Sequence, residues 1–264
     1  MQSRRSFFRN AALTTAALTA SPGVFSREGN GIWPEPSRDQ EGLFFGISLA
    51  EWSLNQSLFG GKLDNLDFPA YAKNNFDIHA VEYVNQFFPS ASQDYARQLL
   101  GRTEDIGVKN LLIMVDREGN LGETDEAMRK TSVENHYKWV ECAKTLGCHS
   151  IRVNAGGRGT REEVAAAAVA SLSELSLYAS DFHINVIVEN HGGYSSDGSW
   201  LSGVIRQVGM INCGTLPDFG NFRISREEIY DTYQGIKELM PFAKGVSAKS
   251  HEFDEGYSQN RPHL

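Results

Sequence analysis

Short apolar runs alternate with helical patterns at intervals of roughly 30–40 residues. This alternation indicates a fold built from successive strand–helix units. Several runs are almost continuously apolar, as strands covered on both faces should be. Strand–helix units in succession imply parallel strands joined by right-handed crossovers. The expected strands are Leu43–Ser48, His79–Val84, Asn110–Val115, Ser150–Asn154, Asn185–Glu189, Asn212–Thr215 and Gly245–Ala248.

The segments between these runs carry the start and stop signals of helices. Thr160 is a good N-cap, and Glu162 and Glu163 follow it in the first turn, where acids complement the helix dipole. Gly147 ends another pattern, since glycine readily adopts the conformation that follows a helix. The expected helices are Pro69–Asn75, Ser92–Ile106, Thr124–Leu146, Thr160–Asp181, Trp200–Val208 and Ser225–Met240.

Two α/β architectures can hold such a chain. An open doubly wound sheet normally has a glycine-rich phosphate loop after its first strand, and residues 46–49 lack that pattern. Polar residues follow nearly every expected strand, where barrel enzymes keep their sites. We therefore predict a (β/α)8 TIM barrel. No eighth strand follows Ala248, so we expect a barrel truncated after strand seven; a homo-oligomer that closes the gap is the alternative.

The N-terminus has the pattern of an export signal. Residues 3–9 contain the pair Arg4-Arg5, and a small apolar run covers residues 11–20. This pattern predicts a twin-arginine signal peptide over residues 1–26, a linker over 27–41 and the barrel over 42–264. The apolar run is too short to span a membrane, so we expect a periplasmic or otherwise exported protein without a membrane span. An amphipathic surface helix is the alternative for this segment.

Charge and cysteine content exclude other classes of protein. The net charge of −8 gives no basic surface for nucleic acid, so we expect no nucleic-acid partner. Three cysteines without a C-x-x-C motif form neither a disulfide framework nor a thiolate zinc site. Cys142, Cys148 and Cys213 are therefore expected to be buried free thiols.

Two acidic residues end neighbouring strands. Glu189 closes an apolar strand and precedes Asn190-His191-Gly192-Gly193, and Asp218 follows the next strand. Two nearby carboxyl groups raise each other's pKa unless a cation neutralises them. Carboxylates with an imidazole suit Mg²⁺ or Mn²⁺ better than a structural zinc. Alternatively, Glu189 is a solvated strand end and Asp218 a turn residue.

These motifs, with Lys249 after the seventh expected strand and Glu82-Tyr83-Val84-Asn85 at the end of the second, resemble the xylose-isomerase-like TIM-barrel superfamily. The branch that fits is the sugar phosphate isomerase/epimerase group, and the resemblance covers about residues 43–254. It implies one divalent metal (Mn, Mg or Co) held by a Glu, an Asp, a His and a Glu from strands five to eight. It also implies that the two Glu residues move a proton of a sugar.

Carried over by residue, the resemblance makes Glu189 and Asp218 metal ligands and Glu189 also a catalytic residue. Asn221 stands where relatives have a substrate-binding histidine. Strand seven departs from the usual His-x-Lys-Asp, because residues 247–250 are Ser-Ala-Lys-Ser. His191 or His251 would then supply the missing imidazole, and the strand-eight Glu has no counterpart.

Other polar residues at strand ends are weaker candidates. Lys249 could act in catalysis by stabilising an oxyanion or binding a hydroxyl group. Each of the others is alternatively a simple loop or core residue. The candidates for substrate binding are Glu82, Asn85, Arg152, Asn154 and Trp52, and Asp116 and Glu118 also follow a strand.

The expected function is an exported, divalent-metal-dependent sugar isomerase or epimerase with a small-molecule sugar as its partner. Such an enzyme removes a proton beside a carbonyl group and forms an enediolate, which a metal stabilises as a Lewis acid. The first alternative is a non-catalytic or vestigial sugar-binding barrel. A phosphodiesterase resembling endonuclease IV is less favoured, because the chain is acidic and has only seven histidines.

Overall fold

The computed structural model describes residues 45–249, 252–253 and 259–260. The predicted signal peptide (1–26), the predicted linker (27–41) and His251 lie outside the described residues. Among the described residues, no helix has the length and apolar character needed to cross a membrane.

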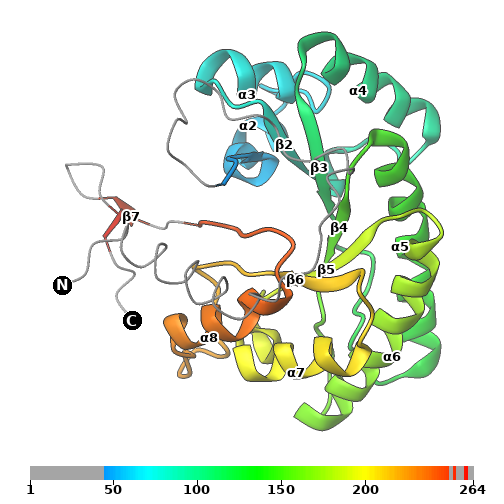
Figure 1. The fold of residues 1–264 in the computed structure, drawn as a ribbon, viewed down its shortest axis with the longest axis vertical. Helices are drawn as coiled ribbons and strands as arrows, with labels where there is room; N and C mark the ends of the chain where they lie inside the picture. The colour runs from blue at the N-terminus through cyan, green and yellow to red at the C-terminus, as the bar shows by residue number, and fades with distance from the viewer. Residues whose placement is uncertain (1–44, 250–251, 254–258, 261–264) are drawn as a thin grey trace, which may run out of the picture. The chain divides into compact units, whose positions relative to one another are not determined.

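A parallel sheet forms the centre of the fold, with its strands side by side in the order of the sequence (Figure 1). Residues 243–247 extend this sheet beyond its last strand through two isolated parallel bridges, Thr215 to Ala243 and Asp218 to Ser247. A separate antiparallel pair joins β7 (Glu252–Phe253) to β8 (Gln259–Asn260). The strands of the main sheet are β1 (Leu49–Ala50), β2 (Ala80–Val84), β3 (Lys109–Met114), β4 (Ser150–Val153), β5 (Asn185–Glu189) and β6 (Cys213–Leu216).

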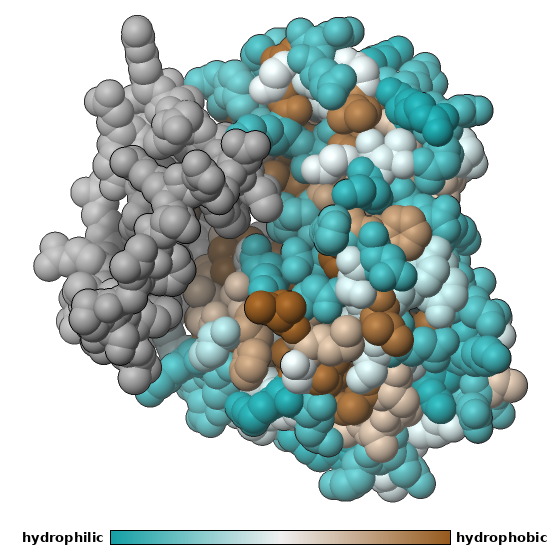
Figure 2. All heavy atoms as spheres, turned by 45° about the vertical axis from the view of Figure 1, so that its right-hand side comes forward, coloured by the Kyte–Doolittle hydropathy of each residue, from teal (hydrophilic) through white to brown (hydrophobic). Residues whose placement is uncertain are grey.

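Helices cover the outer face of the sheet, and from α4 to α8 each contacts the next (Figure 1). Their outward surface is mainly hydrophilic with scattered hydrophobic residues (Figure 2). The helices are α2 (Asn55–Phe59), α3 (Phe68–Phe76), α4 (Gln93–Ile106), α5 (Glu126–Leu146), α6 (Arg161–Ser180), α7 (Gly198–Val208) and α8 (Thr232–Leu239). Short 3₁₀ helices follow some strands and α8: η2 (Glu51–Leu54), η3 (Asn85–Phe87), η4 (Gly193–Ser196) and η5 (Met240–Phe242).

Local capping explains where the long helices begin and end. Thr160 and Glu163 form a complete capping box at the start of α6. Helix α5 ends at Gly147, whose φ of 78° is the left-handed conformation that glycine adopts at little cost. The N-cap of α5 is Asp125 rather than Thr124, because the Asp125 carboxylate accepts from the backbone N–H of Met128.

Inside the sheet, a layer of apolar side chains lies below a layer of polar side chains at the carboxyl ends of the strands. Val84, Leu112, Met114, Ile187 and Leu216 pack together inside the curved sheet. Side chains alternate between the two faces of a strand, so the residues two positions after Met114, Ile187 and Leu216 also face inward, and all three are polar. These inward polar residues are Asp116, Glu189 and Asp218.

The arrangement confirms the predicted α/β class with a partial TIM barrel. Within the described residues, the sheet has the sequential parallel order of a barrel without being closed. The predicted burial of free Cys142, Cys148 and Cys213 is confirmed.

Three predicted elements were wrong in extent. Within the described residues the first strand is Leu49–Ala50, which pairs with β2, whereas residues 45–48 of the predicted Leu43–Ser48 form no strand and Ile47 is exposed; residues 43–44 lie outside the described residues. The predicted helix Ser225–Met240 begins only at Thr232, and the Ser225 hydroxyl instead accepts from the N–H groups of residues 227 and 228 in a turn. The predicted strand Gly245–Ala248 makes isolated bridges rather than a ladder.

Candidate functional site at the carboxyl ends of the strands

Glu189 and Asp218 converge at the carboxyl ends of β5 and β6. Both are buried, with 4% and 0% of their surface exposed. Lys249 lies between them, with Nζ 2.6 Å from Asp218 Oδ2 and 3.8 Å from Glu189 Oε1. The backbone bridge between Asp218 and Ser247 places Lys249 there, since residues 247 and 249 fall on the same face of an extended segment.

Arg152 holds the other side of the cluster. It projects from β4, is 4% exposed, and places Nε 2.8 Å from Glu189 Oε2. Its Nη1 lies 2.7 Å from Asp116 Oδ1, which also accepts from Asn154 Nδ2 at 2.8 Å. The guanidinium therefore bridges the carboxylate of Asp116, two residues after β3, and that of Glu189 at the end of β5.

The pKa values of Glu189 and Asp116 shift in opposite directions. Burial raises the pKa of Glu189 to about 7, and the charge of Asp218 and a hydrogen bond with it act in the same direction. The positive charges of Arg152 and Lys249 oppose this rise. Burial also raises the pKa of Asp116, but the charge and hydrogen bonds of Arg152 and Asn154 outweigh it, and the net pKa is lowered. One cluster thus holds a carboxylate that stays ionised and a carboxyl group that exchanges its proton near neutral pH.

Two asparagines position the aspartates through the backbone. Asn190, fully buried, donates to the carbonyl oxygens of Asp218 (2.9 Å) and Asn221 (3.0 Å) and accepts from the N–H of Asp218 (2.7 Å). Asn85 makes the same kind of pair with Asp116, donating to its carbonyl and accepting from its N–H, both at 2.9 Å. Each asparagine directly follows a strand and fixes the aspartate that follows the next strand.

The other predicted residues lie at different distances from the cluster. Asn221 Nδ2 donates to Glu189 Oε1 at 3.1 Å. Glu82 lies deeper, where Ser48 Oγ donates to its Oε1 at 2.6 Å; burial raises the Glu82 pKa against that hydrogen bond and the Arg152 charge. His191 lies at the rim, where partial burial and then Arg152 lower its pKa and favour the neutral imidazole.

Trp52 lies in an aromatic group over the first strands. It is 44% exposed and contacts Phe59 edge-on at 6.2 Å and Phe87 at 6.5 Å between ring centroids. Beside this group, residues of α2 and the loops after α2 and β2 line a cavity of about 300 Å³, including Phe59, Asn65 and Phe87. The structure therefore gives Trp52 a partly exposed ring face, which suits the predicted contact with a sugar.

Glu51 was missed by the sequence analysis. It is fully buried after β1, where its carboxyl accepts from Asn65 Nδ2 and from the N–H of Val84, each at 2.7 Å. Burial raises its pKa to about 8 against these two hydrogen bonds. The available signal was that a charged residue directly follows a strand. The predicted first strand ended at Ser48, three residues before Glu51, so this signal was not recognised.

The described residues do not fit the predicted divalent metal. No group of three or more His, Cys, Asp or Glu among residues 45–249 could hold one. Ser247 stands where the resemblance requires an imidazole, and its hydroxyl donates to Asp218 Oδ2 at 3.1 Å. His251, the other predicted imidazole, is not among the described residues, so its role as a ligand stays a prediction.

The sequence matches a family described as "Xylose isomerase-like TIM barrel" over residues 69–258. The chain belongs to the xylose isomerase-like TIM barrel family. This confirms the superfamily that the motifs at the strand ends resemble. No curated protein sequence matches the chain at a significant level.

Several solved structures share the fold of this xylose isomerase-like barrel. A 3-keto-D-glucoside 4-epimerase from E. coli is 13% identical, with a TM-score of 0.59 over 74% of this chain and 78% of its own. The IOLI protein with a bound zinc atom is 14% identical, with a TM-score of 0.59 over 77% and 88%. A D-psicose 3-epimerase in the presence of D-fructose is 14% identical, with a TM-score of 0.56 over 68% of this chain. The chain spans 66% of that epimerase's length.

Proposed function

We propose that this xylose isomerase-like barrel is a sugar isomerase or epimerase that removes a proton from a carbon beside a carbonyl group. The observation that carries the proposal is the buried carboxyl group of Glu189, which lies beside the two cations Arg152 and Lys249 at the mouth of the sheet. Its pKa is raised to about 7. The similar folds of two sugar epimerases support the substrate class.

Glu189 is the base in this proposal. Its carboxylate takes the proton from the carbon next to the carbonyl, the C–H electron pair forms a C=C bond, and the carbonyl oxygen becomes an enolate oxygen. A base with a pKa near the working pH is in the correct form and can also return the proton. An isomerisation is completed when the proton of the neighbouring hydroxyl group moves to the enolate oxygen, the hydroxyl carbon becomes the new carbonyl, and Glu189 returns its proton to the former carbonyl carbon. Epimerisation instead needs a second acid on the opposite face.

Lys249 is the group that stabilises the developing negative charge. Its side chain is 28% exposed, whereas that of Arg152 is 5% exposed, so Lys249 is the cation that a substrate oxygen can reach. The ammonium has three N–H donors, and a donor aimed at a developing oxyanion lowers the barrier to proton removal. Arg152 keeps Glu189 in place from below. No step passes through a metal, because the described donors do not fit one.

Solvent exchange tests the proposal directly. In D₂O, the wild-type chain should introduce deuterium at the carbon beside the carbonyl of at least one sugar in a panel of ketoses, aldoses and 3-keto-glucosides. Glu189→Gln should lower this rate by about 10²-fold or more, because the base is lost. Glu104→Gln on the exposed face of α4 is the matched control and should leave it unchanged. Sugar binding without exchange in the wild type would instead support the non-catalytic sugar-binding barrel.

Export remains a separate proposal that rests on the residues of the N-terminus. The Arg4-Arg5 pair followed by a small apolar run is typical of twin-arginine signals. A reporter fused after residue 26 should reach the periplasm, and replacing both arginines by lysine should prevent this. Unchanged export of the double variant would contradict the assignment.

A further inference from the structure

We infer that the Lys249 ammonium group takes the place of the divalent cation expected at Glu189 and Asp218, so that cations of the protein itself balance this pair. The inference concerns binding and holds whether or not the proposed reaction takes place. It is carried by the arrangement of donors around the two carboxylates.

Three of the four carboxylate oxygens have a protein donor, and the fourth, Glu189 Oε2, is in ion-pair contact with Arg152 Nε, which makes no hydrogen bond in the described part of the chain. Asp218 Oδ1 accepts from the N–H of Gly220 at 2.8 Å, and Oδ2 is contacted by Lys249 Nζ at 2.6 Å and by the Ser247 hydroxyl at 3.1 Å. Glu189 Oε1 accepts from Asn221 Nδ2 at 3.1 Å, and Oε2 lies 2.8 Å from Arg152 Nε. A metal would have to displace several of these donors to reach two oxygens at once.

The fold holds Lys249 in this position. Both backbone groups of Ser247 bond to the segment after β6. Its N–H donates to the carbonyl of Pro217, and its carbonyl accepts from the N–H of Phe219. Ser247 and Lys249 then project together toward Asp218. The position that should supply an imidazole ligand thus supplies the Ser247 hydroxyl group, and the Lys249 ammonium group lies beside it.

Charge repulsion gives the same result. The pair Glu189 and Asp218 contacts the two cations Arg152 and Lys249, while Glu82 and Asp116 add two more carboxyl groups near Arg152. A divalent ion between Glu189 and Asp218 would lie next to the Lys249 ammonium and be repelled by it. Removing that ammonium should therefore open the carboxylate pair to a metal.

Mn²⁺ binding followed by electron paramagnetic resonance tests the inference. We expect no stoichiometric Mn²⁺ binding by the wild-type chain and no change in its melting temperature with Mn²⁺ or EDTA. Lys249→Ala should bind Mn²⁺ at least about tenfold more tightly than the wild type, and Mn²⁺ should then raise its melting temperature. Ser247→His added to Lys249→Ala should tighten binding further, because an imidazole joins the two carboxylates.

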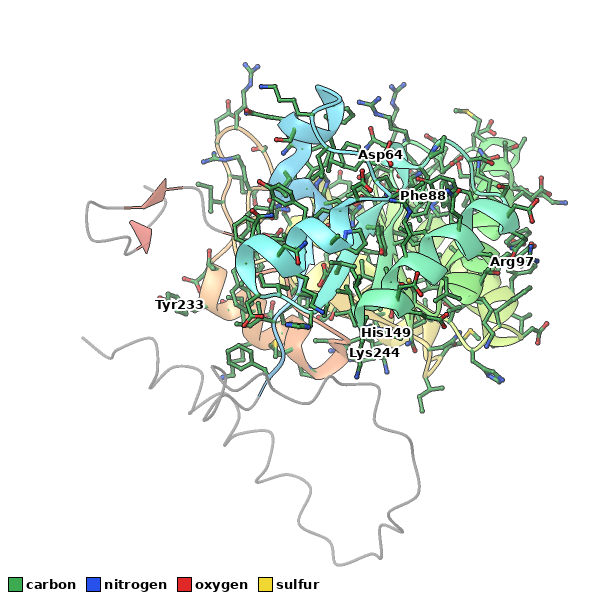
Figure 3. All side chains as sticks on the ribbon, turned by 90° about the horizontal axis from the view of Figure 1, so that it is seen from above. Asp64, Phe88, Arg97, His149, Tyr233 and Lys244 are labelled. Carbon is green, nitrogen blue, oxygen red and sulfur yellow. The ribbon has the colours of Figure 1, made fainter. Side chains whose placement is uncertain are left out.

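Lys244→Ala is the matched control, since it removes one lysine from the same segment. Lys244 lies at the amino end of β6, because its backbone N–H donates to the carbonyl of Thr215 and its side chain approaches Gly214. Figure 3 labels it on the side of the molecule opposite to Phe88, which follows β2. Lys244→Ala should gain no Mn²⁺ binding. Lys249→Met, which keeps the aliphatic stem, replaces the alanine variant if that one fails to fold.

Either of two results would overturn the inference: stoichiometric Mn²⁺ or Zn²⁺ in the wild-type chain, or folded Lys249 variants that bind metal no better than the wild type. Because these measurements do not depend on turnover, their failure is distinguishable from a failure of the exchange assay.

Discussion

Arg152 is the most informative residue to change, because it is a buried cation that contacts two carboxylates from different strands. Its Nε lies 2.8 Å from Glu189 Oε2, and its Nη1 lies 2.7 Å from Asp116 Oδ1. In Arg152→Met the side chain keeps much of its volume and loses its charge. Both carboxyl groups then remain buried without their main cation.

The magnitude follows from this geometry. Breaking a buried ion pair by removing one partner typically costs about 3–5 kcal/mol, because an uncompensated charge stays in a poorly solvated site. Arg152 serves two carboxylates, so we expect the unfolding free energy to fall by about 4 kcal/mol near pH 8. Arg161→Met is the matched control: its ion pair with Asp197 is equally short (2.6 Å), but the Arg161 side chain is 38% exposed. That change should cost about 1 kcal/mol or less.

The cost should also depend on pH. In the wild type, Arg152 helps to lower the pKa of Asp116, so the pair contributes stability above the ordinary pKa of 3.8 and loses it as the pH falls through the lowered value. Arg152 also limits the rise in the pKa of Glu189, which is about 7. Without Arg152, ionising either group in the folded chain is harder. The difference between variant and wild type should therefore grow from acid to alkaline pH.

Urea denaturation of the wild type and the two variants between pH 5 and pH 9 measures these quantities. A loss below about 1 kcal/mol for Arg152→Met at pH 8, no larger than the control's, would refute the reasoning about the buried pair. A large loss that is the same at pH 5 and pH 9 would show that packing rather than charge is responsible.

Three further predictions follow from single contacts. Asn190→Leu should destabilise the fold by about 3 kcal/mol in urea denaturation, because it removes three hydrogen bonds and leaves the buried N–H of Asp218 unpaired. The folded pKa of Glu51 is raised to about 8, so its contribution makes stability fall as the pH rises from 4.5 to about 8 and level off above; melting temperatures of Glu51→Gln should lack this decline. Thr160→Ala should lower the unfolding free energy by about 1 kcal/mol through loss of the capping box, and an unchanged urea midpoint would contradict this.

The sequence by itself determined the order of strands and helices and the residues that end the strands. The strand Asn185–Glu189 and the helix after Thr160 follow from periodicity and capping, which are properties of neighbouring residues. The same periodicity indicated that Glu189 and Asp218 follow consecutive strands and face one edge of the sheet. Local signals were weakest in the segment from Ser225, where a turn and a helix share similar residues.

Only the tertiary structure decided what surrounds these carboxylates. That Arg152 from β4 reaches Glu189 and Asp116 depends on strand register, which no pattern within one strand contains. The backbone bonds of Asn190 join residues 28 positions apart, and the position of Lys249 beside Asp218 depends on the pairing of the segment after α8. The charge state of a buried group is set by the charges and solvent around it, so it becomes defined only when distant parts of the chain meet.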